Sequence, residues 1–260
     1  EWVLLNGNQT ALMFVYYLIT RWKELGKING KEYIVKTIVT TETIKTIAER
    51  NGVEMYDVYT GFKWIANVMR ENEGKKNYIG GGEESYGFLC EDFVRDKDAV
   101  SACVILAEIA AWAKDQGLSL YQLLQKIYVE YGFSKEKGIS VVKKGKSGAE
   151  EIEAMMKKFR ENPLTEIAGS KVTYFYDYST LKGKDYAENE TVTLDMPTTS
   201  NVLQYFTEDN TKVSIRPSGT EPKIKFYCEV HSKVKSIDEL PEAEKAAEEK
   251  INQIKASLGI

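Results

Sequence analysis

Strand-like and helix-like stretches alternate over the first 130 residues, and this alternation limits the folds open to the chain. Short β-type runs such as "KEYIVKTIV" and "VEMYDVY" are each followed by a longer stretch with helical spacing. Strands that alternate with helices through short links form a mainly parallel sheet covered by helices. Residues 1–130 are therefore predicted to form an α/β unit.

The expected strands of this unit are residues 2–5, "KEYIVKTIV", "VEMYDVY" and "KNYIGG". Helices are expected at about 9–25 and in the intervening stretches. The segment "DAVSACVILAEIAAWAKDQG" is apolar almost all round, which predicts a buried helix. Ligands of parallel sheets bind beyond the carboxyl ends of the strands, where "VYTGFK" and "GGGEES" fall.

The pattern changes after "LYQLLQKIYVEYG", so we expect a boundary between about 128 and 136. A strand "ISVVKKG", a helix ended by Pro163 and a strand "SKVTYFYDYS" precede an irregular polar stretch over 180–200. A hairpin turning at Asp209-Asn210 and a charged helix at 239–258 follow. Runs of strands with helices at the ends predict a compact α+β domain over residues 131–260.

Charge and composition exclude several classes of protein. The net charge of −4 argues against a dedicated nucleic-acid binder, which needs a basic face, and acids alternate with the lysines of "EAEKAAEEK". Unbroken apolar runs are too short for a membrane span. Cys90, Cys103 and Cys228 are far apart and lack a CxxC motif, which predicts reduced core thiols in a cytoplasmic protein. His231 has no Cys or His partner nearby and is not expected to be catalytic or to bind metal.

The stretch "RPSGTEP" holds more polar groups than a hairpin turn requires. Arg216 can grip two phosphate oxygens in a fork, and the hydroxyls of Ser218 and Thr220 can donate to others. Around Gly219, successive backbone N–H groups can form a concave anion nest. The alternative is a proline-bounded turn with a solvated Arg.

Two carboxylates follow three glycines in "GGGEESYGF". Glu83 and Ser85 are two residues apart, so in an extended loop both side chains point the same way and suit neighbouring sugar hydroxyls. A flexible loop with solvated acids is the alternative.

Three further cations are candidates for binding an anion. Lys63 follows Thr60 and Gly61 at a strand-to-helix turn, where free N–H groups attract anions. Arg95 and Lys97 share one side of the segment "FVRDKDAV", although they can equally form a solvated charge run with the neighbouring aspartates. No Ser/His/Asp arrangement, Walker loop or metal-ligand cluster is evident in the sequence.

Taken in order, "LLNGNQT", "TGFKWI", "GGEESYG", "VRDKDAV" and "RPSGTEPKIKFY" resemble the second half of the α-phosphohexomutases, the phosphoglucomutase and phosphomannomutase family of isomerases. The resemblance implies a third, α/β domain over 1–130 and a fourth domain over 131–260, an antiparallel sheet with two helices. Because the chain opens in the middle of an expected strand, it looks like a piece of a longer protein whose N-terminal domains are missing.

The resemblance also implies a role for each candidate residue. Glu83 and Ser85 would hold sugar hydroxyls, and Arg216, Ser218, Gly219 and Thr220 would hold the phosphate that is not transferred. Thr60 and Gly61 would lie in the loop that contacts the sugar. Lys63, Arg95 and Lys97 would line the substrate cleft, with Lys63 or Lys97 as a possible assistant in proton movement.

The catalytic parts of the family are missing from the sequence. Its phosphoserine loop and its Mg²⁺-binding Asp-x-Asp-x-Asp-Arg loop belong to the first two domains, so this chain is expected to be inactive alone. The parent would interconvert hexose 1-phosphate and hexose 6-phosphate through glucose 1,6-bisphosphate or its analogue. Glucose, mannose and pentose phosphates stay open as substrates, although "GEES" favours glucose. A phosphosugar-binding module that never catalyses is the alternative.

Overall fold

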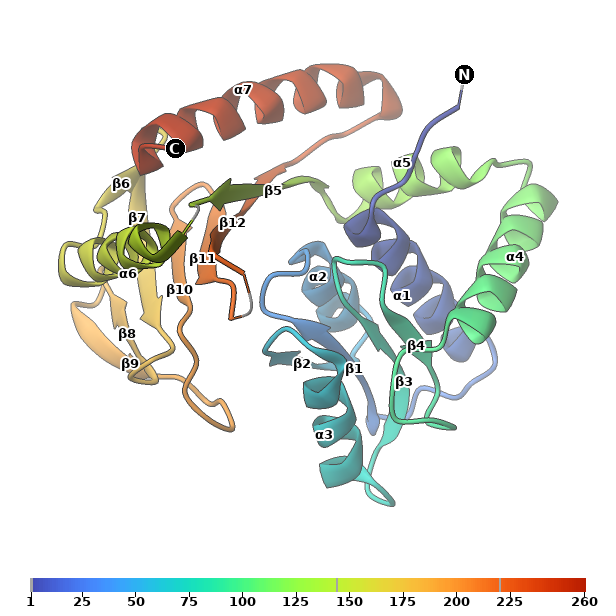
Figure 1. Ribbon diagram of the computed structural model, residues 1–260. Helices are drawn as coiled ribbons and strands as arrows, with labels where there is room; N and C mark the ends of the chain where they lie inside the picture. Colours follow the sequence, from blue (N-terminus) through green and yellow to red (C-terminus); the bar gives the residue numbers. More distant parts are fainter. Residues whose placement is uncertain (1, 144, 220) are drawn as a thin grey trace. The chain divides into compact units, whose positions relative to one another are not determined.

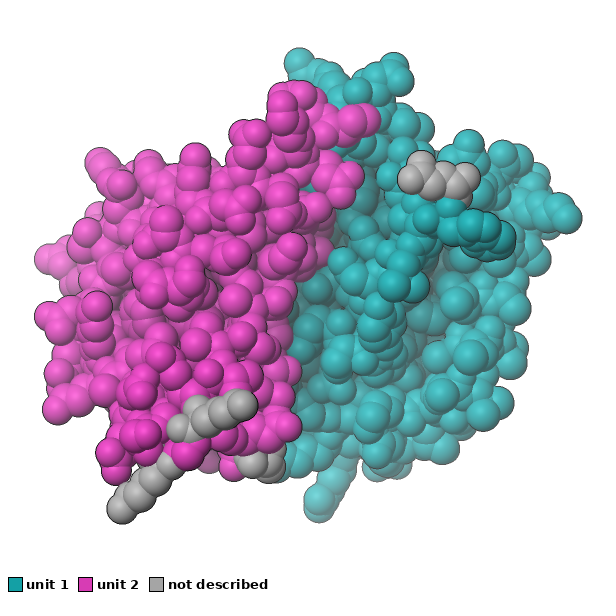
Figure 2. All heavy atoms as spheres, turned by 45° about the horizontal axis from the view of Figure 1, so that its top comes forward, with its two compact units in different colours: residues 1–133, 233–240 teal, residues 134–232, 241–260 magenta. Residues whose placement is uncertain are grey.

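A computed structural model describes residues 2–143, 145–219 and 221–260. The chain divides into two compact units, which Figure 2 colours separately. Unit 1 holds residues 1–133 and 233–240, and unit 2 holds residues 134–232 and 241–260.

Unit 1 is built on a four-stranded sheet in the order β2-β1-β3-β4. The strands β1 (Glu32–Thr37), β2 (Glu54–Val58) and β3 (Asn77–Gly82) are parallel, and β4 (Phe88–Cys90) pairs antiparallel with β3. Two helices connect the parallel strands, α2 (Thr43–Arg50) and α3 (Phe62–Asn72) (Figure 1). The prediction of a mainly parallel sheet with helices is confirmed.

Helices cover this sheet because alternate strand residues point to opposite faces. Tyr33 and Val35 of β1 pack with Phe62 and Ile65 of α3 in one buried apolar cluster. Gly80 of β3 faces the other way, toward Leu18 of α1 (Gly7–Glu24). Every residue of α1 from Ala11 to Ile19 is buried, so this helix forms much of the remaining core.

Two expectations for unit 1 were wrong. Residues 2–5 form no strand, and the chain enters α1 directly through an Asn6 cap. The helix α4 (Ala99–Asp115) buries only Ile109 and Ala113, although its sequence is apolar almost all round. The following helix, α5 (Leu120–Tyr131), completes the unit together with a short 3₁₀ turn at Ile237–Glu239.

Unit 2 is an antiparallel sheet flanked by two helices, α6 (Gly145–Glu161) and α7 (Leu240–Leu258). The strand order is β5-β12-β11-β10-β7-β8-β9, with β6 paired to β7. These strands are β5 (Phe133–Val142), β6 (Glu166–Ile167), β7 (Ser170–Asp177), β8 (Lys182–Asp185), β9 (Glu190–Thr193), β10 (Leu203–Thr207), β11 (Lys212–Pro217) and β12 (Lys223–Ser232). The hairpin predicted at Asp209-Asn210 is confirmed by β10 and β11, with Asn210 at φ 61°.

The stretch 180–200 is more regular than predicted, because β8 and β9 form a hairpin within it. Its polar sequence reflects its place at the edge of the sheet, where β9 is mostly exposed. Antiparallel strands with one solvent-exposed face need few apolar residues.

Unit 2 also contains a buried ionic cluster. Lys212 on β11 lies directly opposite Glu229 on β12, and their charged atoms are 2.9 Å apart. The other oxygen of Glu229 lies 2.8 Å from Nε2 of His231. Burial opposes ionisation of Glu229, but Lys212 and His231 outweigh it and hold the pKa of the carboxyl below its ordinary value. This pairing gives His231 a structural role.

Candidate functional site

The turn ahead of α3 is built around one glycine. Gly61 has φ 112° and ψ 123°, a conformation that L side chains rarely adopt. Because its N-cap is a glycine, α3 has no N-cap side chain to bond its first N–H groups, and these groups form the positive end of the helix. Such an end favours a nearby carboxylate.

That carboxylate is Glu83, which follows β3. The backbone N–H of Gly61 donates to Oε1 of Glu83 over 2.8 Å, and the side chain is only 9% exposed. Two segments predicted separately, "YTGFK" and "GGGEES", are therefore joined by one hydrogen bond. One oxygen of Glu83 is thereby engaged, and among the described residues the other accepts no hydrogen bond.

The second oxygen of Glu83 lies beside Gly87. A Cβ placed on Gly87 would lie 3.0 Å from Oε2 of Glu83 and 3.2 Å from Cδ of Lys97. The Nζ of Lys97 lies 3.1 Å from Oδ1 of Asp96 and 5.9 Å from the centre of the Phe62 ring, next to Gly61. The missing side chain of Gly87 thus leaves space where an acceptor oxygen and a lysine stem converge.

The loop that carries Glu83 is turned, so the assumption of an extended loop was wrong. The N–H of Glu83 donates to the carbonyl of Gly87 over 2.8 Å, which closes residues 83–87 into a compact turn. Glu83 is buried while Ser85 is exposed. Alternation along a strand therefore does not place these two side chains together.

The motif "LLNGNQT" packs against the loop of residues 83–87. A Cβ on Gly7 would lie 1.9 Å from the carbonyl oxygen of Glu84, so only glycine allows this close approach. The Tyr86 hydroxyl donates to the carbonyl of Leu5 over 3.1 Å, and the Thr37 hydroxyl donates to Glu84 over 3.3 Å. The start of α1 thereby fixes the position of the Glu83 loop.

Two other predicted cations of unit 1 lie outside this group. Lys63 is exposed, with its Nζ 4.8 Å from the centre of the Trp64 ring. Arg95 donates to the carbonyl of Asp92 and pairs with Glu73, just beyond the carboxyl end of α3. Gly61 lies at the opposite end of that helix, so Arg95 and Lys97 point to different parts of the unit.

The second group of predicted residues lies where β11 ends, in unit 2. Arg216 is half-buried and, within the described part of the chain, makes no ion pair. The N–H of Ser218 donates to the carbonyl of Lys223 over 2.8 Å, and the Ser218 hydroxyl accepts from the N–H of Glu221 over 3.3 Å. Gly219 is exposed, with nothing near the position of a Cβ. Thr220, predicted as a phosphate ligand, lies outside the described residues.

Lys225 is a candidate that the sequence analysis missed. It is the direct cross-strand partner of Arg216, so both side chains emerge from the same face of the β11–β12 hairpin. Like charges directly opposite each other destabilise a sheet unless an anion lies between them. The alternation in "KIKFY" was the available signal, but the pairing register was needed to use it.

Neither unit offers a metal centre or a membrane span in its described residues. Groups of three or more His, Cys, Asp or Glu side chains able to hold a metal ion do not occur among them. The helices that the structure describes are also too short or too polar to cross a bilayer.

Comparison with protein-family models gives two matches that follow each other along the chain. Residues 6–131 match phosphoglucomutase/phosphomannomutase alpha/beta/alpha domain III. Residues 140–247 match the phosphoglucomutase/phosphomannomutase C-terminal domain. Together these models account for most of the chain.

Curated relatives include phosphoglucomutases from two staphylococci. The Staphylococcus aureus (strain bovine RF122 / ET3-1) protein is 38% identical over 222 residues, which cover 85% of this chain and 39% of the relative. The Staphylococcus haemolyticus (strain JCSC1435) protein is 34% identical over 226 residues, covering 87% and 40%. This chain thus spans about 40% of the length of these relatives.

Solved structures share the fold at low sequence identity. Paramecium pp63/parafusin, a phosphoglucomutase in an open form, aligns with a TM-score of 0.57 and 17% identity over 90% of this chain and 38% of its own. A putative phosphomannomutase from Thermus thermophilus aligns with a TM-score of 0.56 and 18% identity, over 94% of this chain and 41% of its own.

Proposed function

The chain belongs to the phosphoglucomutase/phosphomannomutase family, and we propose that it is the substrate-holding part of a hexose phosphate mutase. In this proposal residues 1–130 are domain III and residues 131–260 are domain IV. Three separate thiols fit a cytoplasmic location for the parent protein.

The observation that carries the proposal is the state of Glu83. A buried carboxylate with one oxygen fixed by the Gly61 N–H can present its other oxygen in one orientation. A preorganised acceptor of this kind suits a sugar hydroxyl, because the ligand does not have to order the side chain. The stem of Lys97 borders the same space at Gly87, and its ammonium, now paired with Asp96, can turn to an adjacent hydroxyl or phosphate oxygen. Thr60 and Ser85 belong to the same two turns and complete the proposed sugar contacts. Lys63 lies on the first turn of α3 at the edge of this group, whereas Arg95 lies at the other end of that helix and is left out of the proposed contacts.

Unit 2 would bind the phosphate that is not being transferred. Arg216 can form a fork with two phosphate oxygens, and Lys225 adds a second charge from the neighbouring strand. Ser218, Gly219 and Thr220 would add hydroxyl and N–H donors. Binding by charge and position, without a nucleophile, fits a family in which phosphoryl transfer depends mainly on positioning and electrostatics.

The whole reaction would need parts that this chain lacks. The parent would pass a phosphoryl group from a phosphoserine to hexose 1-phosphate, forming glucose 1,6-bisphosphate or its mannose analogue. After this intermediate reorients in the site, its other phosphate would return to the serine and release hexose 6-phosphate. Mg²⁺ would sit on the upstream aspartate loop and neutralise the transferred phosphate. The present residues would hold each phosphosugar in either orientation.

A coupled assay for glucose 6-phosphate tests this proposal. The 260-residue chain with glucose 1-phosphate, glucose 1,6-bisphosphate and Mg²⁺ should give no product. A longer polypeptide that joins this chain to the upstream phosphoserine and Mg²⁺ domains should give product. The Glu83→Gln variant of that polypeptide should give at least about tenfold less. Product formation by the 260-residue chain would refute the division of labour. A longer polypeptide that binds the sugar phosphate without turnover would instead support a non-catalytic phosphosugar-binding module, and preference for a pentose phosphate would indicate a phosphopentomutase.

A further inference from the structure

Two polar side chains at the carboxyl end of β1 are completely buried. Lys36 and Thr37 are each 0% exposed, although alternation along the strand points them to opposite faces of the sheet. β1 lies between β2 and β3, so its carboxyl end lies between the strand ends from which the Thr60–Gly61 turn and the Glu83 loop emerge. Both buried residues are therefore close to the candidate sugar site, although neither belongs to the proposed contacts.

The ammonium of Lys36 connects β1 to the end of β2. Lys36 and Asp57 are cross-strand partners, and Nζ of Lys36 lies 2.6 Å from Oδ1 of Asp57. The same nitrogen lies 2.8 Å from Oε1 of Glu42, just before α2, and donates to the Thr40 carbonyl over 3.4 Å. Lys36 thus joins the end of β2 to the start of α2.

This contact lies next to the turn that presents Gly61. Asp57 precedes Gly61 by four residues. The Val58 carbonyl still accepts a hydrogen bond, over 2.8 Å, from the N–H of the residue that follows β1. The direction in which the chain leaves the sheet is therefore set beside Lys36, and with it the position of the Gly61 N–H that holds Glu83.

Thr37 makes the corresponding contact toward β3. Its hydroxyl lies 2.8 Å from the Thr40 hydroxyl and 3.3 Å from a carboxylate oxygen of Glu84, the neighbour of Glu83. The carboxyl end of β1 thus contacts both of the segments that the hydrogen bond from Gly61 to Glu83 joins.

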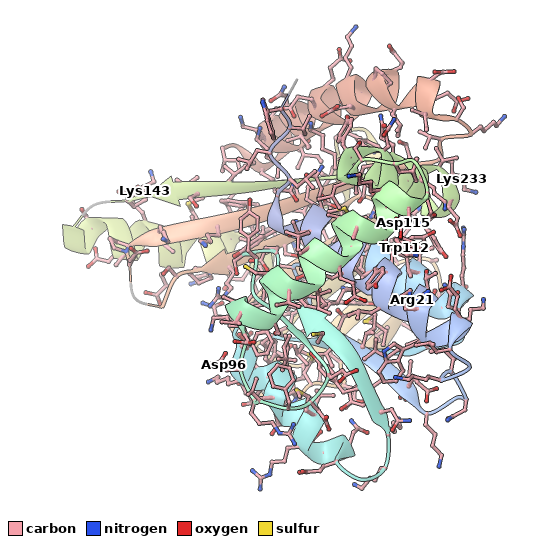
Figure 3. The ribbon with its side chains drawn as sticks, turned by 90° about the vertical axis from the view of Figure 1, so that its right-hand side faces the viewer. Arg21, Asp96, Trp112, Asp115, Lys143 and Lys233 are labelled. Atoms are coloured by element: carbon pink, nitrogen blue, oxygen red, sulfur yellow. The ribbon has the colours of Figure 1, made fainter. Side chains whose placement is uncertain are left out.

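A contribution to stability alone does not explain a buried lysine. Replacing a buried ion pair by apolar side chains is often neutral or stabilising, because desolvation offsets the attraction. The ion pair of Asp96 and Lys97, beside the first turn of α4 in Figure 3, is exposed and contributes little to the order of this edge. A buried cation whose donors are engaged holds its partners in one arrangement.

We propose that Lys36 is a positioning residue that sets the place of the Thr60–Gly61 turn, and through it the orientation of Glu83 toward a sugar hydroxyl. This inference rests on the proposed function and deepens it. The ammonium is fully buried and acts through Asp57 rather than by touching the ligand.

Hydrogen exchange of the Gly61 amide tests the positioning directly. Lys36→Met/Asp57→Asn removes the ion pair and leaves Glu42 partly exposed, so its urea midpoint should stay close to that of the wild type. Relative to the amides of β1, its Gly61 amide should exchange at least about tenfold faster. If the double variant unfolds, Asp57→Asn alone gives the same comparison, because Lys36 then keeps its bond to Glu42.

Calorimetric titration shows whether the displaced turn affects the sugar. Lys36→Met/Asp57→Asn should bind glucose 1-phosphate at least about tenfold more weakly than the wild type. Its affinity for inorganic phosphate should not change, because the proposed phosphate ligand Arg216 lies in unit 2. A purely structural role would not change one affinity without the other.

The same strands carry a matched ion pair at their amino ends. Lys76, just before β3, pairs with Glu54 at the start of β2. Lys76→Met/Glu54→Gln should leave both the Gly61 exchange rate and the glucose 1-phosphate affinity unchanged. Wild-type exchange of Gly61 in Lys36→Met/Asp57→Asn, or an equal effect of the two double variants on affinity, would overturn the proposal.

The exchange rate separates this inference from the proposed function. Faster exchange of Gly61 in the variant of a chain that binds no glucose 1-phosphate would leave Lys36 as the residue that positions Gly61 and would remove the proposed sugar site. Binding of glucose 1-phosphate by the wild type, with unchanged Gly61 exchange in the variant, would do the reverse.

Discussion

Replacing Glu83 separates its structural role from its proposed role in binding. Glu83→Gln keeps an acceptor oxygen for the Gly61 N–H, whereas Glu83→Ala removes it. A hydrogen bond to a charged group contributes about 1.5–3 kcal/mol and a neutral one about 1 kcal/mol. We therefore expect Glu83→Gln to destabilise unit 1 by roughly 1 kcal/mol. Glu83→Ala, which leaves the Gly61 N–H without this partner, should cost roughly 2–3 kcal/mol.

The cost to ligand binding should follow a different order. In Glu83→Gln the oxygen beside Lys97 becomes an amide nitrogen or loses its charge, so the hydroxyl contact is weakened in both variants. Loss of about 1.4 kcal/mol corresponds to tenfold weaker binding of glucose 1-phosphate. Both variants should bind at least about tenfold more weakly, although only Glu83→Ala is strongly destabilised.

Tryptophan fluorescence measures the stability of unit 1 selectively. All four tryptophans belong to this unit: Trp2, Trp22, Trp64 and Trp112. Urea unfolding followed by fluorescence gives the stability change, and calorimetric titration with glucose 1-phosphate gives the affinity. Glu84→Gln is the matched control and should retain the affinity. Wild-type affinity in Glu83→Gln would refute the assignment of Glu83 to the sugar.

Three further predictions concern the space beside Glu83 and the buried ionic cluster of unit 2. Gly87→Ala should lower the stability of unit 1, measured by fluorescence, by on the order of 1 kcal/mol, because the new methyl crowds Glu83. It should also weaken glucose 1-phosphate binding severalfold. Unchanged affinity would mean that the ligand does not use this space. Lys212→Met leaves Glu229 buried without its partner and should destabilise unit 2 by roughly 3–5 kcal/mol, measured by hydrogen exchange of β11. The double variant Lys212→Met/Glu229→Leu should recover most of this stability. A double variant as unstable as the single one would contradict this. Burial disfavours the charged form of His231, but the Glu229 carboxylate outweighs burial and raises the pKa of His231. The stabilisation that this ion pair gives unit 2 should therefore be full below about pH 6.5 and decline as the pH rises through the folded-state pKa. A pH slope of the same size in His231→Gln would assign the dependence to other groups.

Most of the fold could be predicted from the sequence because most helices and strands have a regular apolar pattern along their whole length. α1, the three parallel strands and the β10–β11 hairpin have clear periodicity or turn residues. The error for α4 arose because periodicity shows which surface is apolar and says nothing of what covers it. The strand β4 was missed because its three residues lie within a glycine-rich stretch, where no alternation can be seen.

The candidate site was predicted less completely, for a geometric reason. Gly61 and Glu83 follow β2 and β3, which lie on either side of β1, so their place at the same carboxyl edge could be inferred from the parallel sheet but their hydrogen bond could not. The divergence of Arg95 and Lys97 depends on loop conformation, which no local pattern specifies. Lys225 required the exact register of β11 against β12, which the sequence leaves open.

Calorimetric titration of the 260-residue chain with inorganic phosphate and with glucose 1-phosphate tests the central claim most directly, with Arg216→Ala beside the wild type. If the chain holds phosphosugars through the loop that follows Arg216, glucose 1-phosphate should bind more tightly than inorganic phosphate. Arg216→Ala should then weaken both by at least about tenfold, since a charge-assisted contact is lost. Equal affinities of Arg216→Ala and the wild type for both ligands would contradict the account.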